Sequence, residues 1–430
     1  MRVLMFGWEF PPHISGGLGT ACYGLTKGLS KFRDVQVLFV VPKAFGDEDT
    51  SSAQIIGASD IYVNQRCARV KEYEKELSFI EVDSLLLPYS TPEEYFQLVK
   101  KHEKKTYSRI RGDFEGKFYF KGGYGSNLYE EIINYAIVAS EIAFDFDFDI
   151  IHAHDWLTYP AGIAAKEVSG KPLVVHVHAT EFDRGGGNIN PRIYEIEKEG
   201  MEYADKVITV SNWTRDIVIN KYGIRPEKVI TVYNAVEPLA EWDKISMRRG
   251  ITDKIITFLG RITMQKGPEF FIEAANKVLK KMNNVRFVMA GSGDMMNKMI
   301  QRVAKLGISH RFHFTGFLEG DDVYRMYSIS DVYIMPSISE PFGISPLEAL
   351  QSNVPVIISR QSGVAEVLNH AIKIDFWDVD AMADAIYGIL NYPALSTMFK
   401  KYGKQEVDKL KWETSASYVR DVYYTILNKN

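Results

Sequence analysis

Short apolar runs alternate with amphipathic stretches along most of the chain. The runs at residues 2–6, 149–153, 173–177 and 332–335 have the length of buried strands, and each ends at a turn that contains glycine or polar residues. Apolar residues at helical spacing follow most of these turns. Strands that alternate with helices are typical of βαβ units and parallel sheets. The pattern therefore predicts an α/β protein.

The alternation of predicted strands and helices stops between residues 238 and 253 and then resumes. This stretch contains Pro238 and shows little periodicity, which is typical of a linker. A chain of 430 residues exceeds one ordinary core, because single domains usually hold about 100–200 residues. We expect a first domain over residues 1–237, with an irregular elaboration at 43–121, and a second domain over 254–410. An amphipathic helix is predicted at 413–427.

Composition is that of a globular protein with no basic surface. Hydrophobic residues make up 46% and charged residues 25% of the chain, and the formal net charge is -4. This balance argues against nucleic acid or an anionic membrane as a partner. The longest apolar runs, such as 35–42, are far shorter than a membrane span, and the apolar residues 1–6 lack a basic leader. Two cysteines exclude a disulfide framework and a zinc cluster. We expect a cytoplasmic enzyme without integral membrane association.

Two strand-to-helix turns carry groups suited to a phosphate. Gly16 and Gly17 allow the backbone to come close to a ligand, and the helix start that follows favours negative charge. A lone Gly-Gly pair also occurs in plain tight turns, and the absence of Gly-x-Gly-x-x-Gly argues against a dinucleotide dehydrogenase. In the second turn, Arg261 and Lys266 can neutralise a pyrophosphate, arginine by forked hydrogen bonds and lysine as a point charge. The alternative is a pair of solvated surface charges.

A third turn follows the strand at 332–335. It contains Glu340 and Gly343, and a helix predicted to begin near Pro346 carries Glu348. Backbone N–H groups at 343–345 would point outward from this helix start, where a phosphate or a sugar hydroxyl can accept them. Two carboxylates eight residues apart can bracket a hydroxylated ligand. The alternative is a turn residue and a solvated helix residue.

Histidines end two of the predicted strands. His154 and His178 should face one crevice, because parallel strands present their carboxyl ends at the same edge of a sheet. His152 and His176 share strand faces with them, and such pairs are also found in metal sites. No cluster of carboxylates or cysteines accompanies these histidines in the sequence, which argues against zinc. For His178, a satisfied histidine at a strand end is an equal alternative.

Residues 336–350 resemble the Glu-x7-Glu signature of retaining glycosyltransferases of the GT-B fold, in the Glu-Pro-Phe-Gly form of the glycogen and starch synthase group. The turn at 260–267 resembles the Gly-Arg-x4-Lys-Gly motif of the same family, and residues 152–155 resemble its His-x-His-Asp motif. The resemblance covers nearly the whole chain and is least certain at 43–121. It implies two Rossmann-like domains facing each other across a cleft, with a helix at 411–430 that crosses back to the first domain.

The resemblance assigns a role to each matching residue. Catalytic positions are those that meet the donor sugar or stabilise the departing diphosphate, namely His154, Arg261, Lys266 and Glu340. Donor-binding positions surround the pyrophosphate, base, ribose and sugar, namely Gly16, Gly17, Gly291, Leu318, Phe342, Gly343, Ile344 and Glu348. Among these, Glu340 contacts the sugar hydroxyls and Glu348 holds the ribose. The family pattern requires no metal and no cofactor beyond the nucleotide-sugar donor.

The activity implied is transfer of a glucosyl unit from ADP-glucose or UDP-glucose to the non-reducing end of an α-1,4-glucan, with retention at the anomeric carbon. Related enzymes usually place a lysine just before the glycines, where this chain has Ile14 and Ser15, so the donor nucleotide stays open. The alternatives are a transferase acting on a small sugar, a sugar phosphate or a lipid-linked acceptor, a non-catalytic glucan-binding protein, and a sugar-nucleotide epimerase.

Overall fold

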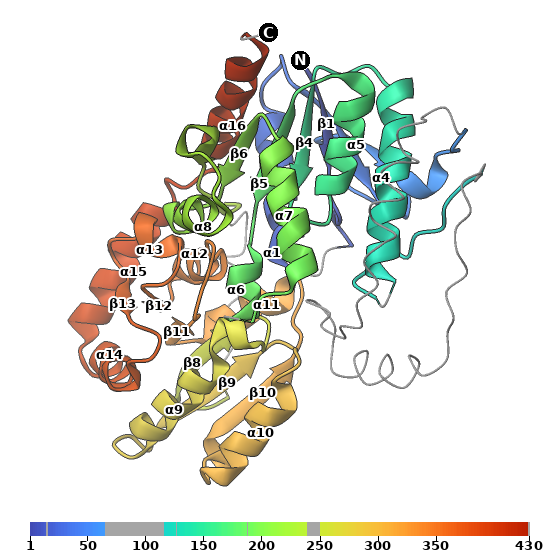
Figure 1. Cartoon of the computed structure of the whole chain (residues 1–430). Helices are drawn as coiled ribbons and strands as arrows, with labels where there is room; N and C mark the ends of the chain where they lie inside the picture. The colour runs from blue at the N-terminus through green and yellow to red at the C-terminus, as the bar shows by residue number, and fades with distance from the viewer. Residues whose placement is uncertain (14–15, 65–115, 126, 187, 239–249, 429–430) are drawn as a thin grey trace, which may run out of the picture. The chain divides into compact units, whose positions relative to one another are not determined.

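The computed structural model describes residues 1–13, 16–64, 116–125, 127–186, 188–238 and 250–428 (Figure 1). Most of the predicted elaboration at 43–121 and of the predicted linker at 238–253 therefore lies outside the described residues. The chain forms two compact units. Unit 1 comprises Met1–Glu181, Ile189–Ala235 and Trp412–Asn430, and unit 2 comprises Phe182–Asn188 and Val236–Lys411.

Unit 1 is built on a parallel sheet. In spatial order its strands are β3 (Gln54–Gly57), β2 (Gln36–Val41), β1 (Arg2–Phe6), β4 (Ile150–His154), β5 (Leu173–Val177), β6 (Lys206–Thr209) and β7 (Val229–Thr231). Every neighbouring pair is parallel, and the central strand β1 pairs Val3 with both Val37 and Ile150. The central strands are buried on both faces because helices cover both sides of the sheet.

Helices pack on the two faces of this sheet. They are α1 (Gly17–Leu29), α4 (Leu128–Asp145), α5 (Tyr159–Ser169), α7 (Pro191–Tyr203), α8 (Asn212–Tyr222) and α16 (Trp412–Leu427), with 3-10 turns at Ala58–Asp60 and Pro226–Lys228. A short helix, α6 (Glu181–Gly185), belongs to unit 2 apart from its first residue. A Cβ placed at Gly162 of α5 would lie 2.9 Å from Cβ of Ala153. The preceding residue of β4, His152, instead meets Tyr423 of α16. Because successive strand residues point to opposite faces, α5 and α16 cover opposite sides.

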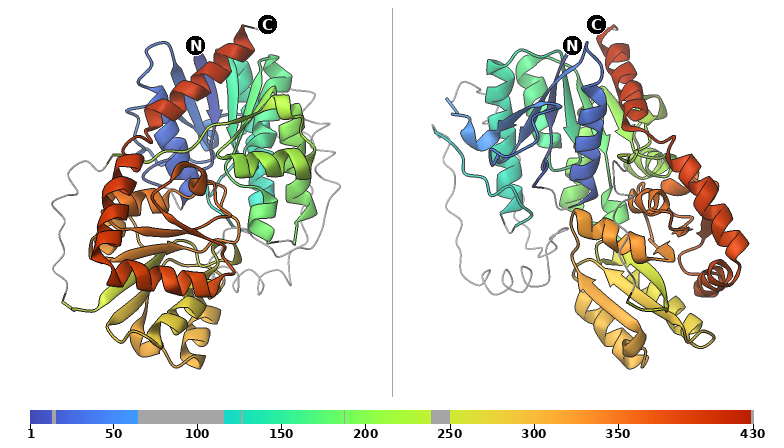
Figure 2. Two further views of the ribbon diagram at one scale, coloured as in Figure 1. Left: turned by 90° about the vertical axis from the view of Figure 1, so that its left-hand side faces the viewer. Right: turned by 180° about the vertical axis from the view of Figure 1, so that it is seen from behind.

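The C-terminal helix α16 packs along α1 within unit 1 (Figure 2, right). Trp412 lies against α1, where the missing side chain of Gly24 makes room for its indole and that of Gly28 makes room for its backbone carbonyl. Further along α16, the guanidinium of Arg420 and the hydroxyl of Tyr424 both donate to Oδ2 of Asp34, at 2.7 and 2.5 Å. These contacts hold α16 against α1 and against the turn that follows α1.

Unit 2 repeats the plan with a second parallel sheet. Its strands are, in spatial order, β10 (Phe312–Gly316), β9 (Val285–Ala290), β8 (Lys254–Leu259), β11 (Val332–Met335), β12 (Val356–Ser359) and β13 (Ile372–Ile374). The helices are α9 (Pro268–Leu279), α10 (Met296–Lys305), α11 (Asp321–Ile329), α12 (Ser345–Gln351), α13 (Val364–Val367), α14 (Val379–Asn391) and α15 (Pro393–Val407), with 3-10 turns η5 (Met264–Lys266) and η6 (Ser309–Arg311). The α/β class predicted from the sequence is confirmed.

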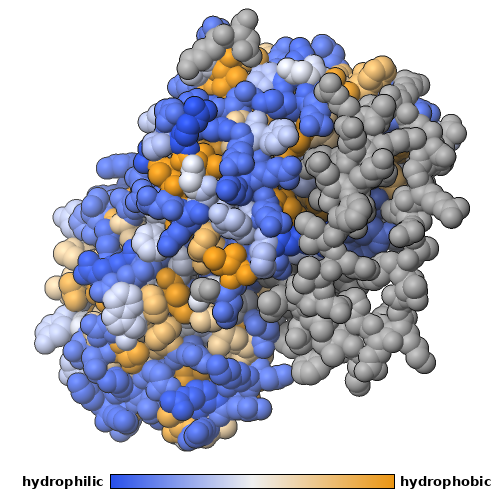
Figure 3. All heavy atoms as spheres, in the orientation of Figure 1, coloured by the Kyte–Doolittle hydropathy of each residue, from blue (hydrophilic) through white to orange (hydrophobic). Residues whose placement is uncertain are grey.

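Polar residues cover much of the face shown in Figure 3, with apolar residues scattered among them. The large exposed apolar side chains are spread along the sequence and include Tyr119, Phe144 and Tyr392. Within the described residues, none of the helices combines the length and the apolar character needed to span a bilayer.

Candidate active site

The carboxyl ends of β8 and β11 in unit 2 bring two opposite charges together. Lys266 ends the turn η5, and its Nζ lies 2.5 Å from Oε2 of Glu340, which follows β11. Ser337 donates a second hydrogen bond to the same oxygen at 3.1 Å. Glu340 is only 6% exposed, whereas Lys266 is half-buried. A buried carboxylate in this setting needs its cation, because an unpaired charge away from water is costly.

Backbone geometry creates this pair. Gly267 has a positive φ of 65°, and a Cβ at that position would lie 2.1 Å from the carbonyl oxygen of Pro336. The η5 turn can therefore lie directly against the end of β11 only because residue 267 is glycine. On the other side, the Glu340 amide donates to Gln361 and its carbonyl accepts from Gly363, both at 2.9 Å. Glu340 is thus fixed from both sides.

Arg261 extends the charged cluster along the same turn. It lies just after the end of β8 and is half-buried. Its Nη2 donates to Oε1 of Gln265 at 3.5 Å. Gln265 in turn donates to the carbonyl of Ser339 at 3.1 Å. The charge of Arg261 also opposes the rise that desolvation causes in the pKa of Asp294, an exposed residue of the loop after β9. The structure thus brings Arg261, Lys266 and Glu340 to one edge of the sheet.

Two contacts in this region were not predicted from the sequence. Residues Phe182–Asn188 cluster with unit 2, and the hydroxyl of Ser339 donates to Oδ1 of Asp183 at 2.5 Å. Asp294 and Gln265 likewise accompany Arg261 without belonging to a recognised motif. Folding brings Asp183 to Ser339 and Asp294 to Arg261 from distant parts of the sequence, whereas Gln265 lies only 4 residues after Arg261.

Glu348 lies on α12, one helix turn beyond the start of that helix. The hydroxyl of Tyr327 donates to Oε2 of Glu348 at 3.3 Å and to the carbonyl of Ser345 at 3.2 Å. Glu348 is half-buried, and desolvation raises its pKa to about 7 although the Tyr327 hydrogen bond opposes the rise. This carboxyl group therefore changes charge near neutral pH.

We expect replacement of Glu348 by glutamine to remove a pH dependence of stability. Because the pKa is raised on folding, the folded state holds this proton more tightly than the unfolded chain. The associated stability is complete below the usual carboxyl range and is lost as pH rises to about 7. Urea midpoints measured at several pH values from about 5 to 8 should fall more for the wild type than for Glu348→Gln. Parallel falls in the two proteins would contradict this account.

The remaining predicted donor positions of unit 2 lie around the same sheet edge. Gly343 and Ile344 are half-buried in the turn before α12, whereas the ring of Phe342 is buried and its carbonyl accepts from Val364 at 2.8 Å. Leu318 packs its side chain against a small apolar cluster that contains Ile255, Val288 and Met326. The side chains of Phe342 and Leu318 thus have packing roles, and the predicted ligand contacts of their backbones stay predictions.

Unit 1 carries a histidine cluster at the carboxyl ends of β4 and β5. Nδ1 of His154 lies 2.9 Å from Nε2 of His178, and the register pairs His154 with His176 directly across the two strands. His152 occupies the same face, with Nδ1 2.5 Å from the hydroxyl of Tyr423. Burial lowers the pKa of all four histidines, that of His178 to about 3, so the imidazoles are neutral at physiological pH.

The residue after His154 has an unusual backbone. Asp155 is a non-glycine residue with a positive φ of 64°, and its amide donates to the carbonyl of His176 at 2.9 Å. Such conformations are uncommon outside glycine and concentrate at functional sites. Gly16 and Gly17 are exposed at the start of α1, and among the described residues no atom lies within 4 Å of a Cβ placed at either. Their backbones are therefore accessible to a ligand.

Two family profiles match the chain. The one described as Glycosyltransferase Family 4 matches residues 115–238, and the one described as Glycosyl transferases group 1 matches residues 243–406. An uncharacterized glycosyltransferase of Methanocaldococcus jannaschii is 28% identical over 98% of both chains. The glycogen synthase of Mycobacterium tuberculosis H37Rv is 22% identical over 98% of this chain and 94% of its own. D-inositol 3-phosphate glycosyltransferase 2 of Catenulispora acidiphila is 26% identical over 64% of this chain and 70% of its own.

Solved structures agree in fold. Sucrose-phosphate synthase from Thermosynechococcus elongatus has a TM-score of 0.72 at 16% identity and covers 100% of both chains. The Anabaena protein HepE, solved in complex with UDP and glucose, has a TM-score of 0.66 at 16% identity, covering 98% of this chain and 99% of its own. The fold and the two profiles define a GT-B glycosyltransferase. The chain belongs to this family, with a family 4 region followed by a group 1 domain.

Proposed function

We propose that this glycosyltransferase moves a glucosyl unit from ADP-glucose or UDP-glucose to the non-reducing end of an α-1,4-glucan, with retention at the anomeric carbon. The observation that carries the proposal is the cluster at the ends of β8 and β11, where Lys266 pairs with the buried Glu340 and Arg261 lies on the same turn. Such a cluster supplies positive charge for a diphosphate and a fixed carboxylate for sugar hydroxyls.

The chemistry follows from where charge develops. Cleavage of the bond between sugar and diphosphate leaves negative charge on the departing oxygen and positive charge on the sugar ring. Arg261 and Lys266 stabilise the departing diphosphate, and Glu340 accepts hydrogen bonds from the sugar hydroxyls. Glu348 accepts from the ribose, and we assign His154 to the donor sugar. Attack by the acceptor on the same face, with the leaving phosphate taking the acceptor's proton, preserves the anomeric configuration.

These roles divide the work between fixed groups. Glu340 holds the Lys266 ammonium in place before the reaction begins. The ammonium therefore needs little reorganisation as negative charge develops on the departing diphosphate. The basic pair also performs the charge neutralisation that a divalent cation would otherwise supply, and we propose that transfer is independent of added metal. We expect that chelation with EDTA does not lower the rate.

A small acceptor is the second candidate. It is favoured by a relative named D-inositol 3-phosphate glycosyltransferase, which is 26% identical over 64% of this chain. The same donor cluster would serve either acceptor, because Arg261, Lys266 and Glu340 are assigned to the donor. The choice therefore depends on the acceptor side of the enzyme.

Product analysis tests the proposal and separates the two candidates. Radiolabelled ADP-glucose and UDP-glucose are each offered with glycogen, with free sugars and with sugar phosphates. We expect label in glycogen that an α-1,4-specific glucosidase removes and whose new linkage is α by NMR. Label in a sugar phosphate instead would establish the small-acceptor candidate. A β linkage would overturn the retaining mechanism.

A further inference from the structure

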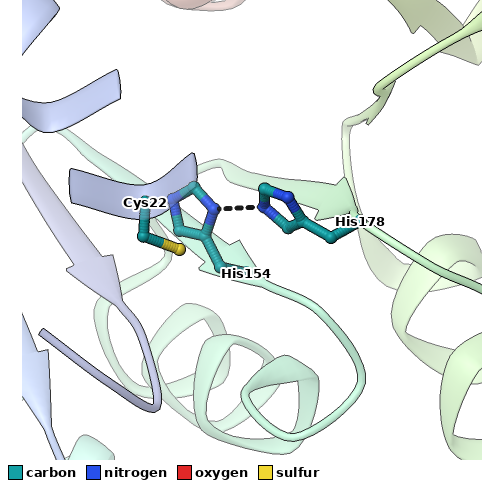
Figure 4. A group of neighbouring side chains, drawn as sticks. All are labelled: Cys22, His154 and His178. Carbon is teal, nitrogen blue, oxygen red and sulfur yellow. Dashed lines mark hydrogen bonds between the residues drawn. The ribbon is translucent and has the colours of Figure 1, made fainter. Parts of the chain in front are cut away.

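Unit 1 holds a thiol beside two of its histidines. Cys22 of α1, His154 of β4 and His178 after β5 each offer one ligand atom within 4.8 Å of the other two (Figure 4). Cys22 and His154 are 1% and 0% exposed, whereas His178 is half-buried and gives the group an open side. Cys22 is far from these histidines in the sequence, and the packing of α1 brings it to them.

We propose that Cys22, His154 and His178 bind a single Zn²⁺ ion. One thiolate and two imidazoles are a ligand set that Zn²⁺ prefers, and a fourth, tetrahedral position would remain for water or substrate. The two facing nitrogens, His154 Nδ1 and His178 Nε2, are 2.9 Å apart. Two nitrogens bound to one Zn²⁺ at about 2.0–2.1 Å stand about 3.3–3.4 Å apart, so the rings need to open by only a few tenths of an ångström.

Binding of Zn²⁺ requires a proton to move on one imidazole and the thiol to lose its proton. One of the two neutral imidazoles donates the hydrogen bond that joins them, and it must carry its proton on the other ring nitrogen before both can ligate. His154 allows this shift, since its Nε2 has no hydrogen-bond partner among the described residues. The buried Cys22 is a protonated thiol, because desolvation and the nearby carboxylates of Asp155 and Glu9 raise its pKa. Binding therefore forms a Zn–S bond and releases one thiol proton to solvent.

A neighbouring histidine trio is a poorer site. His152, His154 and His176 also lie within reach of one another, but the His152 ring stacks on His154 at 29° and on His176 at 4°. The His152 and His176 rings are nearly parallel and direct their in-plane lone pairs along separate planes, which do not meet at one ion. Nδ1 of His152 is also engaged with the hydroxyl of Tyr423 at 2.5 Å. The His154 and His178 nitrogens instead face each other (Figure 4). Negative charge from Asp155 and Glu9 further favours a cation beside Cys22.

The functional consequence rests on the proposed role of His154 at the donor sugar. A zinc ion on His154 would occupy a nitrogen and fix the ring, so micromolar Zn²⁺ should inhibit transfer reversibly. The proposal itself is tested by binding alone. Neither sugar nucleotide nor acceptor is then present, and a failure of the transferase assignment would leave the result untouched.

Calorimetric titration of the full chain with Zn²⁺ is the experiment. In two buffers of different ionisation enthalpy, we expect one ion per chain and about one proton released. Co²⁺ in place of Zn²⁺ should give the near-ultraviolet band of a thiolate ligand. Cys22→Ala should abolish the band and weaken Zn²⁺ binding at least tenfold. His178→Ala, at a half-buried strand end, should weaken binding similarly and serves if Cys22→Ala fails to fold.

Matched controls separate this site from adventitious binding. His13, Asp47 and Glu48 form an exposed group of possible ligands, and Cys67 is the other cysteine of the chain. His13→Ala and Cys67→Ala should both retain wild-type stoichiometry and the cobalt band. Loss of binding in either control, or binding unchanged in both Cys22→Ala and His178→Ala, would overturn the proposal, as would no binding by the wild type.

Discussion

Replacing Lys266 by alanine should lower the rate of sugar transfer by about 10²- to 10³-fold, the usual cost of losing one preorganised charge at a reacting centre. The same change should lower stability, because the carboxyl group of Glu340 is in a residue only 6% exposed and would lose the ammonium at 2.5 Å. Leaving a buried charged group unsatisfied costs about 1–3 kcal/mol or more. Steady-state release of nucleotide diphosphate measures the first effect, and a thermal melt measures the second.

The double variant Lys266→Met with Glu340→Gln separates the two effects. Neither charge is then present, and an uncharged pair of similar volume often restores stability where a single replacement does not. The melting temperature should therefore recover toward the wild-type value while transfer stays low. Recovery of transfer together with stability would contradict the catalytic role of both residues. A Lys266→Ala protein with the wild-type rate would contradict the role assigned to the lysine.

Replacing Gly291 by alanine should destabilise unit 2 by about 2–5 kcal/mol, through overpacking and backbone strain together. A Cβ at this position would lie 1.8 Å from the carbonyl oxygen of Gly260, and its φ is 139°. The ends of β8 and β9 approach each other only because residue 291 has no side chain. Urea unfolding of the variant measures the loss.

Gly307→Ala is the matched control for that change. Gly307 also has a positive φ, of 72°, but among the described residues no atom lies within 4 Å of its Cβ position. Only the backbone cost of about 1–2 kcal/mol should then appear. Equal losses in the two variants would show that the contact with Gly260 is not what requires glycine at 291.

The hydrophobic pattern of the sequence was sufficient to predict strands that border the charged cluster of unit 2 and the histidine cluster of unit 1. The predicted strands at 2–6, 173–177 and 332–335 coincide with β1, β5 and β11. Each is a buried apolar run bounded by a turn, so its limits are visible in the sequence. The helix expected near Pro346 begins at Ser345, since proline is compatible with a first helical turn.

The sequence pattern could not predict which distant residues become neighbours when the chain folds. Cys22 reaches His154 only because α1 packs on the sheet face to which His154 of β4 points, and strand order decides that. Asp183 reaches Ser339 across more than a hundred residues. The raised pKa of Glu348 is a further case, because it depends on how deeply packing buries one helix residue. Charges and spacing in the sequence predict a donor site, whereas the pKa values of the residues there depend on burial and on remote partners.

Release of nucleotide diphosphate by wild type and Lys266→Ala, with and without glycogen, tests the central claim most directly. We expect release from ADP-glucose or UDP-glucose that requires the acceptor, and a rate at least about 10²-fold lower for the folded variant. Equal rates in the two proteins, or no release from either donor, would contradict the assignment of the β8 and β11 cluster to glucosyl transfer.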